Sequence, residues 1–274
     1  MADLAGTLLG AGIPPVAEGR RIRLLDGTTV PKAGKEEKKN SGLWRLHCAF
    51  DLPEERFSFI EITDEKGAER LDRTAFAKGD IAIADRGYMH PEPLAHILEQ
   101  GADVIIRTPW TGARWLNADG KPFDLLAALE AAENAGLLDG PIWVARKKAP
   151  PLALRLVAIR KPPVAAEASR AQARQTAKRK GKTIFGGTLA AAAWVILITS
   201  LDAKAFPADR IGGLYRARWR IEMAFKRLKS LIGLSAPPSK DPQIAKTWIL
   251  AHLLMILLLE PHTSAPEISP RMAA

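Results

Sequence analysis

Cysteine is almost absent from this 274-residue chain, because Cys48 is the only one. A lone cysteine excludes an internal disulfide and a thiolate zinc site, and it fits a reducing, cytoplasmic compartment. The five histidines never stand at a ligand spacing such as H-E-x-x-H, so we expect no zinc site.

Long hydrophobic runs are also missing. The first residues lack the basic region that opens a secretory signal. The strongest apolar run, residues 248–259, is about a dozen residues long, whereas a membrane span needs roughly 20. We therefore predict a buried core helix at this run and no membrane partner.

What the chain does have is positive charge. Its formal net charge is +10 and its hydrophobic fraction is 47%. The hydrophobic fraction indicates a folded protein, and the charge indicates a polyanionic partner, either nucleic acid or an anionic membrane surface. Charge alone does not choose between them, but the lack of a membrane segment favours DNA or RNA.

The first part of the chain reads as an α/β domain with a mixed sheet. Two helices are expected among its strands, a polar one at 66–75 and one at 91–101 that has proline near its start and glycine at its end. The residues 53–56 resemble a short hairpin connection. The β-rich segments that we expect to form strands are 21–30, 43–52, 57–64, 81–88 and 102–108.

From about residue 109 to 200 the pattern changes, which we interpret as an inserted, largely β module. Its expected elements are a helix at 124–140, strands at 141–146, 152–160 and 194–199, and a basic segment at 168–182. In the basic segment Arg170, Arg174 and Lys178 recur every four residues, so a helix would place them on one face. That face is either a DNA-backbone contact or simply a solvated surface.

Helices are expected to resume after Asp202. The predicted organisation is therefore a first core part at 1–108, the insertion module at 109–200, a second core part at 201–260 and a disordered tail at 261–274.

The stretch YRARWRIEMAFKRLK, residues 215–229, holds one acidic residue among six bases. On one continuous helix, Tyr215, Arg218, Glu222 and Lys229 would share an arc of about 60°. The adjoining arc would carry the core stripe, which is Leu214, Ala217, Ile221, Phe225, Leu228 and Ile232. An Arg218–Glu222 pair on a solvated helix face would explain the carboxylate without any function, and it would contribute only a few tenths of a kcal/mol.

Two further acids suggest more. Asp26 and Asp85 each close an apolar strand and are followed within two residues by glycine. In α/β sheets, sites gather where strands end. Two strand-end aspartates and Glu222 could build a two-metal phosphoryl-transfer site for Mg²⁺, with Mn²⁺ as a substitute.

Other polar residues carry no comparable pattern. We expect His47 to be structural, and the loop lysines Lys32, Lys35, Lys38 and Lys39 to form either a DNA-backbone patch or a solvated loop. The remaining acids that could be mistaken for ligands are Asp51, Glu61, Asp64 and Asp80.

The spacing Tyr215-x2-Arg218-x3-Glu222-x6-Lys229 resembles the Y-R-E-K signature of bacterial DDE transposases of the "insertion sequence four" family. The blocks LLDGTT, LWRLHCAFDL and ADRGY resemble other blocks of that family, in the same order. The resemblance covers roughly residues 20–260 and implies a ribonuclease-H-like core interrupted by a largely β insertion.

By this resemblance, Asp26, Asp85 and Glu222 are the metal-binding catalytic triad. The residues that it implies at the DNA are Tyr215, Arg218 and Lys229, with the basic neighbours Arg220 and Lys226 and with Trp194, which would stack near the cut in hairpin-forming members. The implied reaction is a metal-dependent nick that frees a 3′-OH, followed by attack of that 3′-OH on DNA. Double-stranded DNA is the expected partner, and synapsis of two ends implies a homodimer on DNA.

Only 25 residues precede Asp26, where members of the family carry a separate domain for the inverted repeats. The part used in end synapsis also looks short. Three hypotheses follow: an active transposase core, a truncated remnant that binds DNA or inhibits a full-length partner, and a ribonuclease-H-like nuclease or resolvase. The last does not require the Tyr-Arg-Glu-Lys spacing, so the spacing argues against it.

Overall fold

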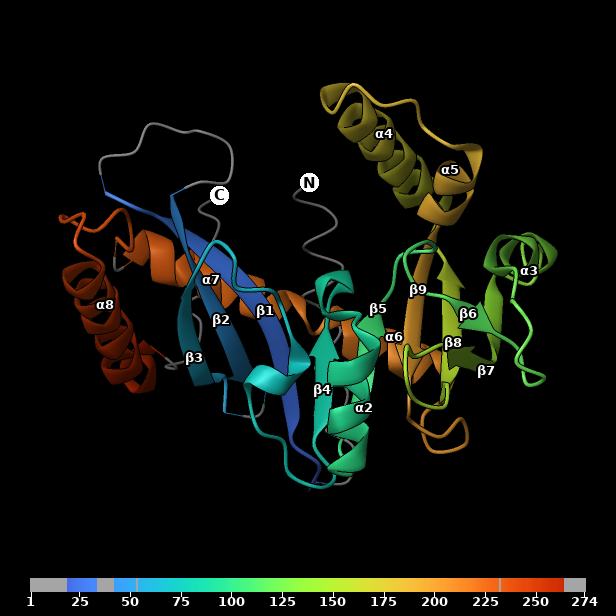
Figure 1. Cartoon of the computed structure of the whole chain (residues 1–274), viewed down its shortest axis with the longest axis horizontal. Helices are drawn as coiled ribbons and strands as arrows, with labels where there is room; N and C mark the ends of the chain where they lie inside the picture. The colour runs from blue at the N-terminus through green and yellow to red at the C-terminus, as the bar shows by residue number, and fades with distance from the viewer. Residues whose placement is uncertain (1–18, 34–41, 53, 232, 264–274) are drawn as a thin grey trace, which may run out of the picture. The chain divides into compact units, whose positions relative to one another are not determined.

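The computed structural model describes residues 19–33, 42–52, 54–231 and 233–263. The chain forms two compact units, each made from separate stretches of sequence. Unit 1 comprises residues up to Leu25 together with Glu69–Trp219, and unit 2 comprises Asp26–Ala68 together with the residues from Arg220 onward. Figure 1 labels the helices and strands of both units.

Unit 1 is built on a mixed sheet. The first part of β1 (Ile22–Pro31) lies parallel to β4 (Ile81–Ala84), and β4 lies parallel to β5 (Asp103–Arg107). All four residues of β4 are buried, as expected for a central parallel strand covered on both faces. The sheet continues antiparallel from β5 through β9 (Trp194–Thr199), β8 (Leu152–Arg160), β7 (Leu137–Val144) and β6 (Trp115–Leu116).

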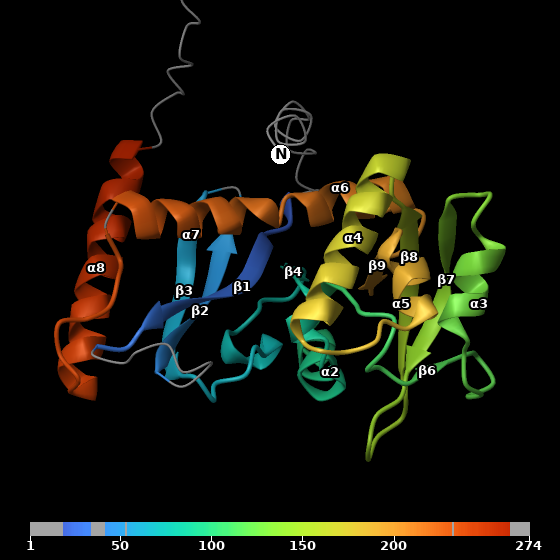
Figure 2. The same cartoon turned by 90° about the horizontal axis from the view of Figure 1, so that it is seen from above.

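Helices cover both faces of this sheet. The helix α2 (Pro91–Glu99) and the helix α6 (Ala208–Arg216) lie on opposite faces, as the two views in Figures 1 and 2 show. The helices α3 (Leu125–Ala131), α4 (Pro163–Arg179) and α5 (Gly186–Ala192) belong to the predicted insertion module, where α5 contacts both α3 and α4. The core of unit 1 runs from the β4 region into the module without a break.

Unit 2 contains an antiparallel hairpin of β2 (Leu43–Asp51) and β3 (Arg56–Asp64), with the helices α7 (Trp219–Leu231) and α8 (Pro242–Thr263). Glu55, which directly precedes β3, has φ 49°, the left-handed conformation common in tight turns. Phe225 of α7 stacks on Phe57 of β3, with ring centroids 5.8 Å apart. This contact seats the apolar stripe of α7 on the strands.

The strands at 21–30, 43–52, 57–64, 102–108, 152–160 and 194–199 are confirmed to within one or two residues, and so is the helix at 91–101. The basic segment at 168–182 lies mostly in α4, which begins earlier, at Pro163, and ends at Arg179. The mixed sheet with flanking helices is an α/β arrangement of the ribonuclease-H-like kind, as predicted.

The predicted helix at 66–75 is wrong. The segment contains only a 3₁₀ turn, Leu71–Arg73, and Leu71 is its one fully buried side chain. Just before it, the Asp64 carboxylate accepts from the Lys66 N–H at 2.9 Å and fixes a turn instead of a helix. Without a repeating apolar face, a helix here would have nothing to bury.

Two other predicted elements are shorter than expected. The helix at 124–140 ends at Ala131, because Gly136 at φ 68° turns the chain into β7. The strand at 81–88 ends at Ala84, where Asp85 starts the 3₁₀ turn Arg86–Tyr88.

The helix α8 was expected to be a buried core helix and to end at residue 260, but it reaches Thr263. Ala245, Ile249 and Leu253 are buried, whereas Ile244, Leu250, Leu254, Met255 and Leu258 are largely exposed. The apolar run therefore buries only a narrow stripe within unit 2. The remainder of the predicted tail, 264–274, lies outside the described residues. Over the described part of the chain, every helix is too short or too polar to cross a membrane.

Candidate active site

Asp85 lies directly after the buried strand β4, at its carboxyl end. Its Oδ1 accepts the Gly87 N–H at 2.7 Å and caps the 3₁₀ turn Arg86–Tyr88. Tyr88 anchors this turn, since its side chain is only 1% exposed. The carboxylate is therefore held at the sheet edge where ligands of α/β proteins usually bind.

Glu69 approaches the same turn, which the sequence did not predict. A Cβ added to Gly87 would lie 2.0 Å from Glu69 Oε2 and 3.1 Å from Asp85 Oδ1. Both carboxylates thus flank Gly87, and glycine is the residue that leaves room for them. Glu69 stands in a polar stretch without periodicity, so no pattern in the sequence could have identified it.

Arg107 stands beside Asp85, because β4 and β5 are parallel with Ala84 opposite Ile106. Each is the residue that follows this pair along its own strand. A guanidinium next to a strand-end carboxylate is well placed to hold a phosphate. The sequence analysis missed Arg107, because the register of two strands whose paired residues are 22 positions apart is a property of the folded sheet.

Tyr215 lies on α6 in the same unit, and its hydroxyl is buried without a hydrogen bond of good geometry to any described residue. Burial raises the pKa of Tyr215, the Arg218 and Arg107 guanidinium groups oppose this rise, and the Asp85 carboxylate adds to it. The Arg218 guanidinium carbon lies 6.0 Å from the Tyr215 ring centroid. Unit 1 therefore brings Asp85, Arg107, Tyr215 and Arg218 into one electrostatic group.

The single helix predicted for the signature stretch is wrong in one respect. The helix α6 ends at Arg216, Ala217 and Arg218 form a turn, and α7 begins at Trp219. The N–H groups of Ala217 and Arg218 donate three residues back, to Leu214 and Tyr215. This tighter winding changes the angle between successive side chains, so the shared arc of about 60° does not hold across the turn.

Glu222 lies in the first turn of α7 and is half-buried. A carboxylate there is favoured by the positive end of the helix dipole. Ile221, Phe225 and Leu228 are buried and confirm the predicted stripe along α7, as does Leu214 on α6. Ala217 is only partly buried, and Ile232 lies outside the described residues.

Asp26 belongs to unit 2 and follows Leu25 in β1. Its Oδ1 accepts the Gly27 N–H at 2.8 Å, and its side chain is half-buried. Burial, followed by the negative charge of Asp26, raises the pKa of the Cys48 thiol. Cys48 is therefore an inert thiol beside a carboxylate and has no nucleophilic role.

The predicted triad is divided between the units, with Asp85 in unit 1 and Asp26 and Glu222 in unit 2. Among the described residues, no group of three or more His, Cys, Asp or Glu side chains is placed to hold a metal ion. The joint role of the three carboxylates stays a prediction.

The basic residues of the signature stretch differ in their surroundings. Arg220 forms an ion pair with Glu55 within unit 2, whereas Lys226 and Lys229 are exposed on α7. The exposed lysines fit a surface for phosphates. Arg220 would first have to leave Glu55, since exposed pairs are weak and exchange readily.

Trp194 begins β9 and is only 5% exposed, within the core of unit 1. The structure thus places it as a packing residue, and its stacking role at the cut stays a prediction.

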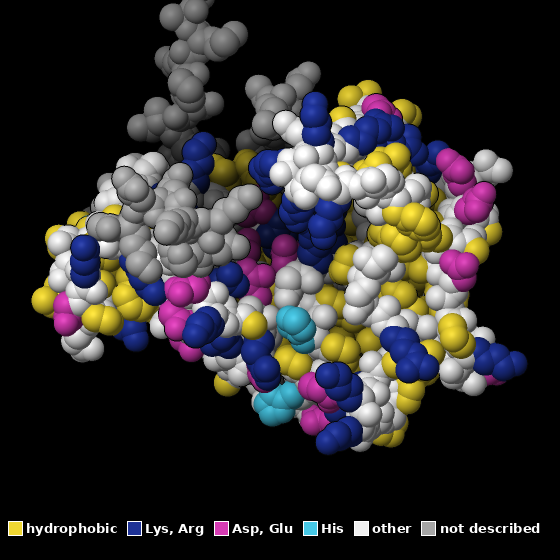
Figure 3. Space-filling view, turned by 45° about the horizontal axis from the view of Figure 1, so that its top comes forward, with side chains coloured by type: hydrophobic (Ala, Val, Ile, Leu, Met, Phe, Trp, Pro, Cys, Tyr) yellow, Lys and Arg dark blue, Asp and Glu magenta, His cyan; other side chains and the backbone are white. Residues whose placement is uncertain are grey.

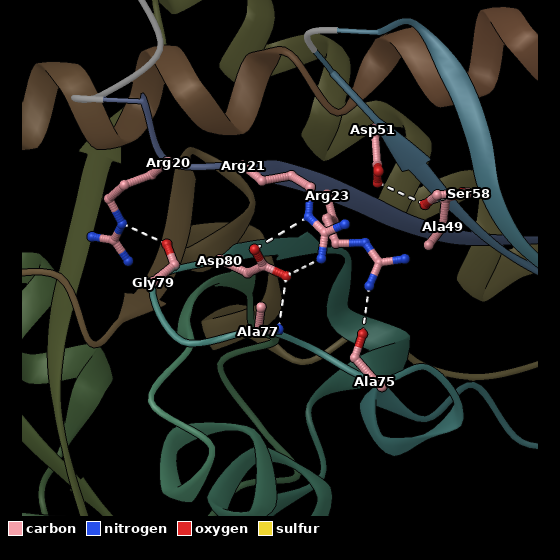
Figure 4. Close-up of polar contacts among 10 residues, drawn as sticks. All are labelled: Arg20, Arg21, Arg23, Ala49, Asp51, Ser58, Ala75, Ala77, Gly79 and Asp80. Carbon is pink, nitrogen blue, oxygen red and sulfur yellow. Dashed lines mark hydrogen bonds and ion pairs between the residues drawn. The ribbon is translucent and has the colours of Figure 1, made fainter.

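The other acids have local structural partners (Figure 4). In unit 1, Asp80 accepts from Arg21 at 2.6 Å and from the Ala77 N–H at 3.0 Å. In unit 2, Asp51 accepts from Ser58 Oγ at 2.6 Å. His47 is buried with its Nε2 2.9 Å from Thr63 Oγ1, which confirms its structural role.

Of the four loop lysines, the structure describes only Lys32, whose Nζ lies 2.8 Å from Glu65 Oε2 in an ion pair. Lys35, Lys38 and Lys39 lie outside the described residues.

The basic segment is helical as predicted, in α4. Glu167 pairs with Arg170 at 3.5 Å and with Arg174 at 2.9 Å, whereas Lys178 is exposed. Lys and Arg side chains gather on the face of the molecule drawn in Figure 3, where hydrophobic side chains are exposed beside them.

Comparisons with known proteins agree on one family. The family model described as "Transposase DDE domain" matches residues 17–258. The putative transposase InsL for insertion sequence element IS186A from Escherichia coli (strain K12) is 38% identical over 255 residues, which cover 91% of this chain and 68% of that protein. The transposase for insertion sequence element IS421 from Escherichia coli is similar to the same extent, with 38% identity and the same coverage.

Proposed function

The chain belongs to the Transposase DDE domain family, and on this premise we propose that Asp26, Asp85 and Glu222 are its catalytic carboxylates. The protein is a DDE transposase, a polynucleotidyl transferase that carries out DNA transposition of an insertion sequence element. The Tyr215-x2-Arg218-x3-Glu222-x6-Lys229 spacing supports the narrower assignment to the "insertion sequence four" family.

DDE transposases typically use divalent metal ions. Carboxylate oxygens are the donors that hard cations prefer, and the Asp85 carboxylate, at a strand end and anchored through Oδ1, fits this role. We assign Mg²⁺ to the site, with Mn²⁺ as a substitute. Two such ions would supply Lewis acidity at the scissile phosphate.

The residues of unit 1 account for phosphate binding. Arg107 and Arg218 offer planar guanidinium groups, which bind phosphate oxygens with two parallel hydrogen bonds. In unit 2, Lys226 and Lys229 are exposed on α7 and are proposed to bind DNA phosphates as well. Arg107, which stands beside Asp85, joins the residues that the signature implies.

The surroundings of Tyr215 argue against a covalent intermediate between this tyrosine and DNA. Burial raises the pKa of Tyr215, so its hydroxyl stays protonated at neutral pH and is a poor nucleophile. Water therefore attacks the phosphorus first, the bond from phosphorus to the 3′ oxygen breaks, and a 3′-OH is released. The oxygen of that 3′-OH then attacks a phosphorus of the target DNA and forms a new ester bond to it. The bond from this phosphorus to the target's own 3′ oxygen breaks, so the two strands are joined and the displaced target strand leaves with a free 3′-OH.

The proposed partner is double-stranded DNA, at the element's ends and at the target, within the bacterial cytoplasm. Two ends must be held together for transposition, so we also propose a homodimer on DNA. Light scattering of the protein with an end-containing duplex would test the dimer, and a mass of one chain per duplex would reject it.

The experiment for the catalytic assignment is nicking of supercoiled plasmid with Mg²⁺ or Mn²⁺. Glu222→Gln should fold and bind DNA like the wild type but lose cleavage, because the change removes one negative charge and keeps the size of the side chain. Glu130→Gln makes the same chemical change on an exposed site of α3 and should cleave normally.

If all three proteins bind DNA and none nicks it, the chain acts as a non-catalytic DNA-binding remnant. If Glu222→Gln unfolds, the carboxylate is structural. Metal-dependent nicking that only Glu222→Gln loses supports the proposal.

A further inference from the structure

A pair of stacked aromatic rings lies in unit 1, and neither ring has a part in the site described above. The rings of Trp110 and Phe185 have centroids 5.7 Å apart and planes inclined by 15°. We propose that this pair, the aromatic platform, binds an unpaired DNA base by stacking. The inference rests on the proposed function of DNA binding, and it names a contact of the predicted insertion module.

Packing against unit 1 fixes the positions of both rings of the platform. Trp110 packs against the core of unit 1, and Phe185 caps the start of α5. A Cβ added to Gly187 would lie 2.9 Å from Phe185 Cε1 and 2.5 Å from Leu126 Cδ1. The ring thus fits against the glycine backbone, which fixes its orientation at little cost in side-chain freedom on binding.

The outer ring is available to a ligand. Phe185 is 65% exposed, although one of its faces is against Trp110. An ordered aromatic ring with one open face is how proteins stack nucleic-acid bases, since every base has a π-face. Trp194, the tryptophan that the resemblance implied for stacking, is 5% exposed and offers no such face.

Charge around the platform favours a polyanion over a protein segment. Residues 168–201 contain six Lys and Arg and no Asp or Glu. Four of these bases are exposed and make no ion pair with any described residue: Lys178, Arg179, Lys180 and Lys182. Lys182 is three residues from Phe185, a reach of about 10 Å along an extended chain.

Trp110 has bases on its own segment as well. Arg107 precedes it by three residues and Arg114 follows it by four, and residues 107–118 contain no acid. Basic residues therefore stand close to both rings along the chain, and their guanidinium and ammonium groups could bind the phosphates of a stacked strand. This combination of ring and bases matches single-stranded DNA-binding surfaces.

The test is the affinity of the full chain for a 20-nucleotide oligothymidylate and for a duplex of equal length, at two salt concentrations. Phe185→Leu keeps the apolar side chain and removes the π-face. It should weaken binding of the single strand about tenfold, equivalent to about 1.4 kcal/mol, and change duplex binding by less than about twofold. Phe185→Tyr keeps the ring and should bind the single strand like the wild type.

Val164→Ala is the matched control, because Val164 is an 81% exposed apolar residue of α4 in the same module. It should leave both affinities unchanged. Equal single-strand affinity for the wild type and Phe185→Leu would overturn the platform, and so would an equal loss of single-strand and duplex affinity. If the wild type binds neither DNA, the proposed function fails as well. If the wild type nicks plasmid DNA but Phe185→Leu binds the single strand as tightly as the wild type does, only the platform is rejected.

Discussion

Replacing Asp85 by asparagine separates the chemistry of this residue from its place in the fold. The substitution keeps the shape of the side chain and removes its negative charge. The asparagine oxygen can still accept the Gly87 N–H, which lies 2.7 Å from Asp85 Oδ1 in the native turn. The turn Arg86–Tyr88 should therefore survive.

The expected cost in stability is small. A hydrogen bond to a charged group contributes about 1.5–3 kcal/mol and a neutral one about 0.5–1.5 kcal/mol, so the loss is about 1 kcal/mol. Because Asp85 is only partly buried, we take this as the upper value. For a chain of this size the midpoint of thermal unfolding should fall by roughly 2–4 °C. Cleavage of plasmid DNA should be lost, since the proposed metal ligand is gone.

The same variant reports on Tyr215. The Asp85 carboxylate contributes to the raised pKa of Tyr215, so Asp85→Asn should lower that pKa. The chain has only two tyrosines, and Tyr88 is 1% exposed, which makes an absorbance titration of tyrosinate readable. Asp119→Asn, in an exposed turn, is the control and should change none of the three measurements. A stability loss above about 3 kcal/mol, or a Tyr215 pKa that does not fall, would refute the reasoning.

Two further predictions concern unit 1. Arg155→Ala should lower the free energy of unfolding by about 3 kcal/mol, because it removes a buried guanidinium that donates to Asp139 at 2.6 and 2.7 Å and to the Phe206 carbonyl at 2.6 Å. Denaturant unfolding checks this, and a change below 1 kcal/mol would mean that water replaces the contact. Burial, and then the charge of Arg107, lowers the pKa of Lys161 to about 8 from an ordinary 10.5. The folded state binds this proton less tightly than the unfolded state, so the Lys161 contribution to stability should rise between pH 8 and 10.5, by on the order of 1–2 kcal/mol. Lys161→Met should flatten that part of the stability–pH curve, and an unchanged slope would contradict the assignment.

Local pattern predicted much of the fold. The strand at 194–199 and the parallel strand at 81–84 are apolar runs, which the sequence marks directly. The basic segment at 168–182, where a helix was expected to align its bases, lies mostly in α4, which is rich in alanine and in long polar side chains that favour helix. In contrast, the segment 66–75 has helix-forming residues but no face to bury, and tertiary packing overrode propensity there.

The residues of the candidate site could be predicted only where they form a motif with a fixed spacing in the sequence. Asp85, Glu222 and their neighbours stand in a recognisable motif, whereas Arg107 and Glu69 acquire their positions from strand register and from a loop. The stacking of Trp110 on Phe185 joins residues 75 positions apart. No local pattern reports such a contact, because it depends on how the sheet orders its strands.

The order of the strands makes β9 the connection between β5 and the strands of the predicted insertion module. Thr199 lies opposite both Ile105 of β5 and Arg155 of β8, and its hydroxyl donates to the Val104 carbonyl at 2.7 Å. Backbone hydrogen bonds of β9 thus join the predicted insertion module to β5, the strand that pairs with β4 beside Asp85. Removing the predicted module would leave backbone N–H and C=O groups of β5 unpaired, and this exposed apolar edge strand could pair with other chains. Amide hydrogens of β5, β9 and β8 should consequently exchange as one cooperative block, so strain applied at the module reaches the Asp85 strand through a stiff lattice rather than a hinge.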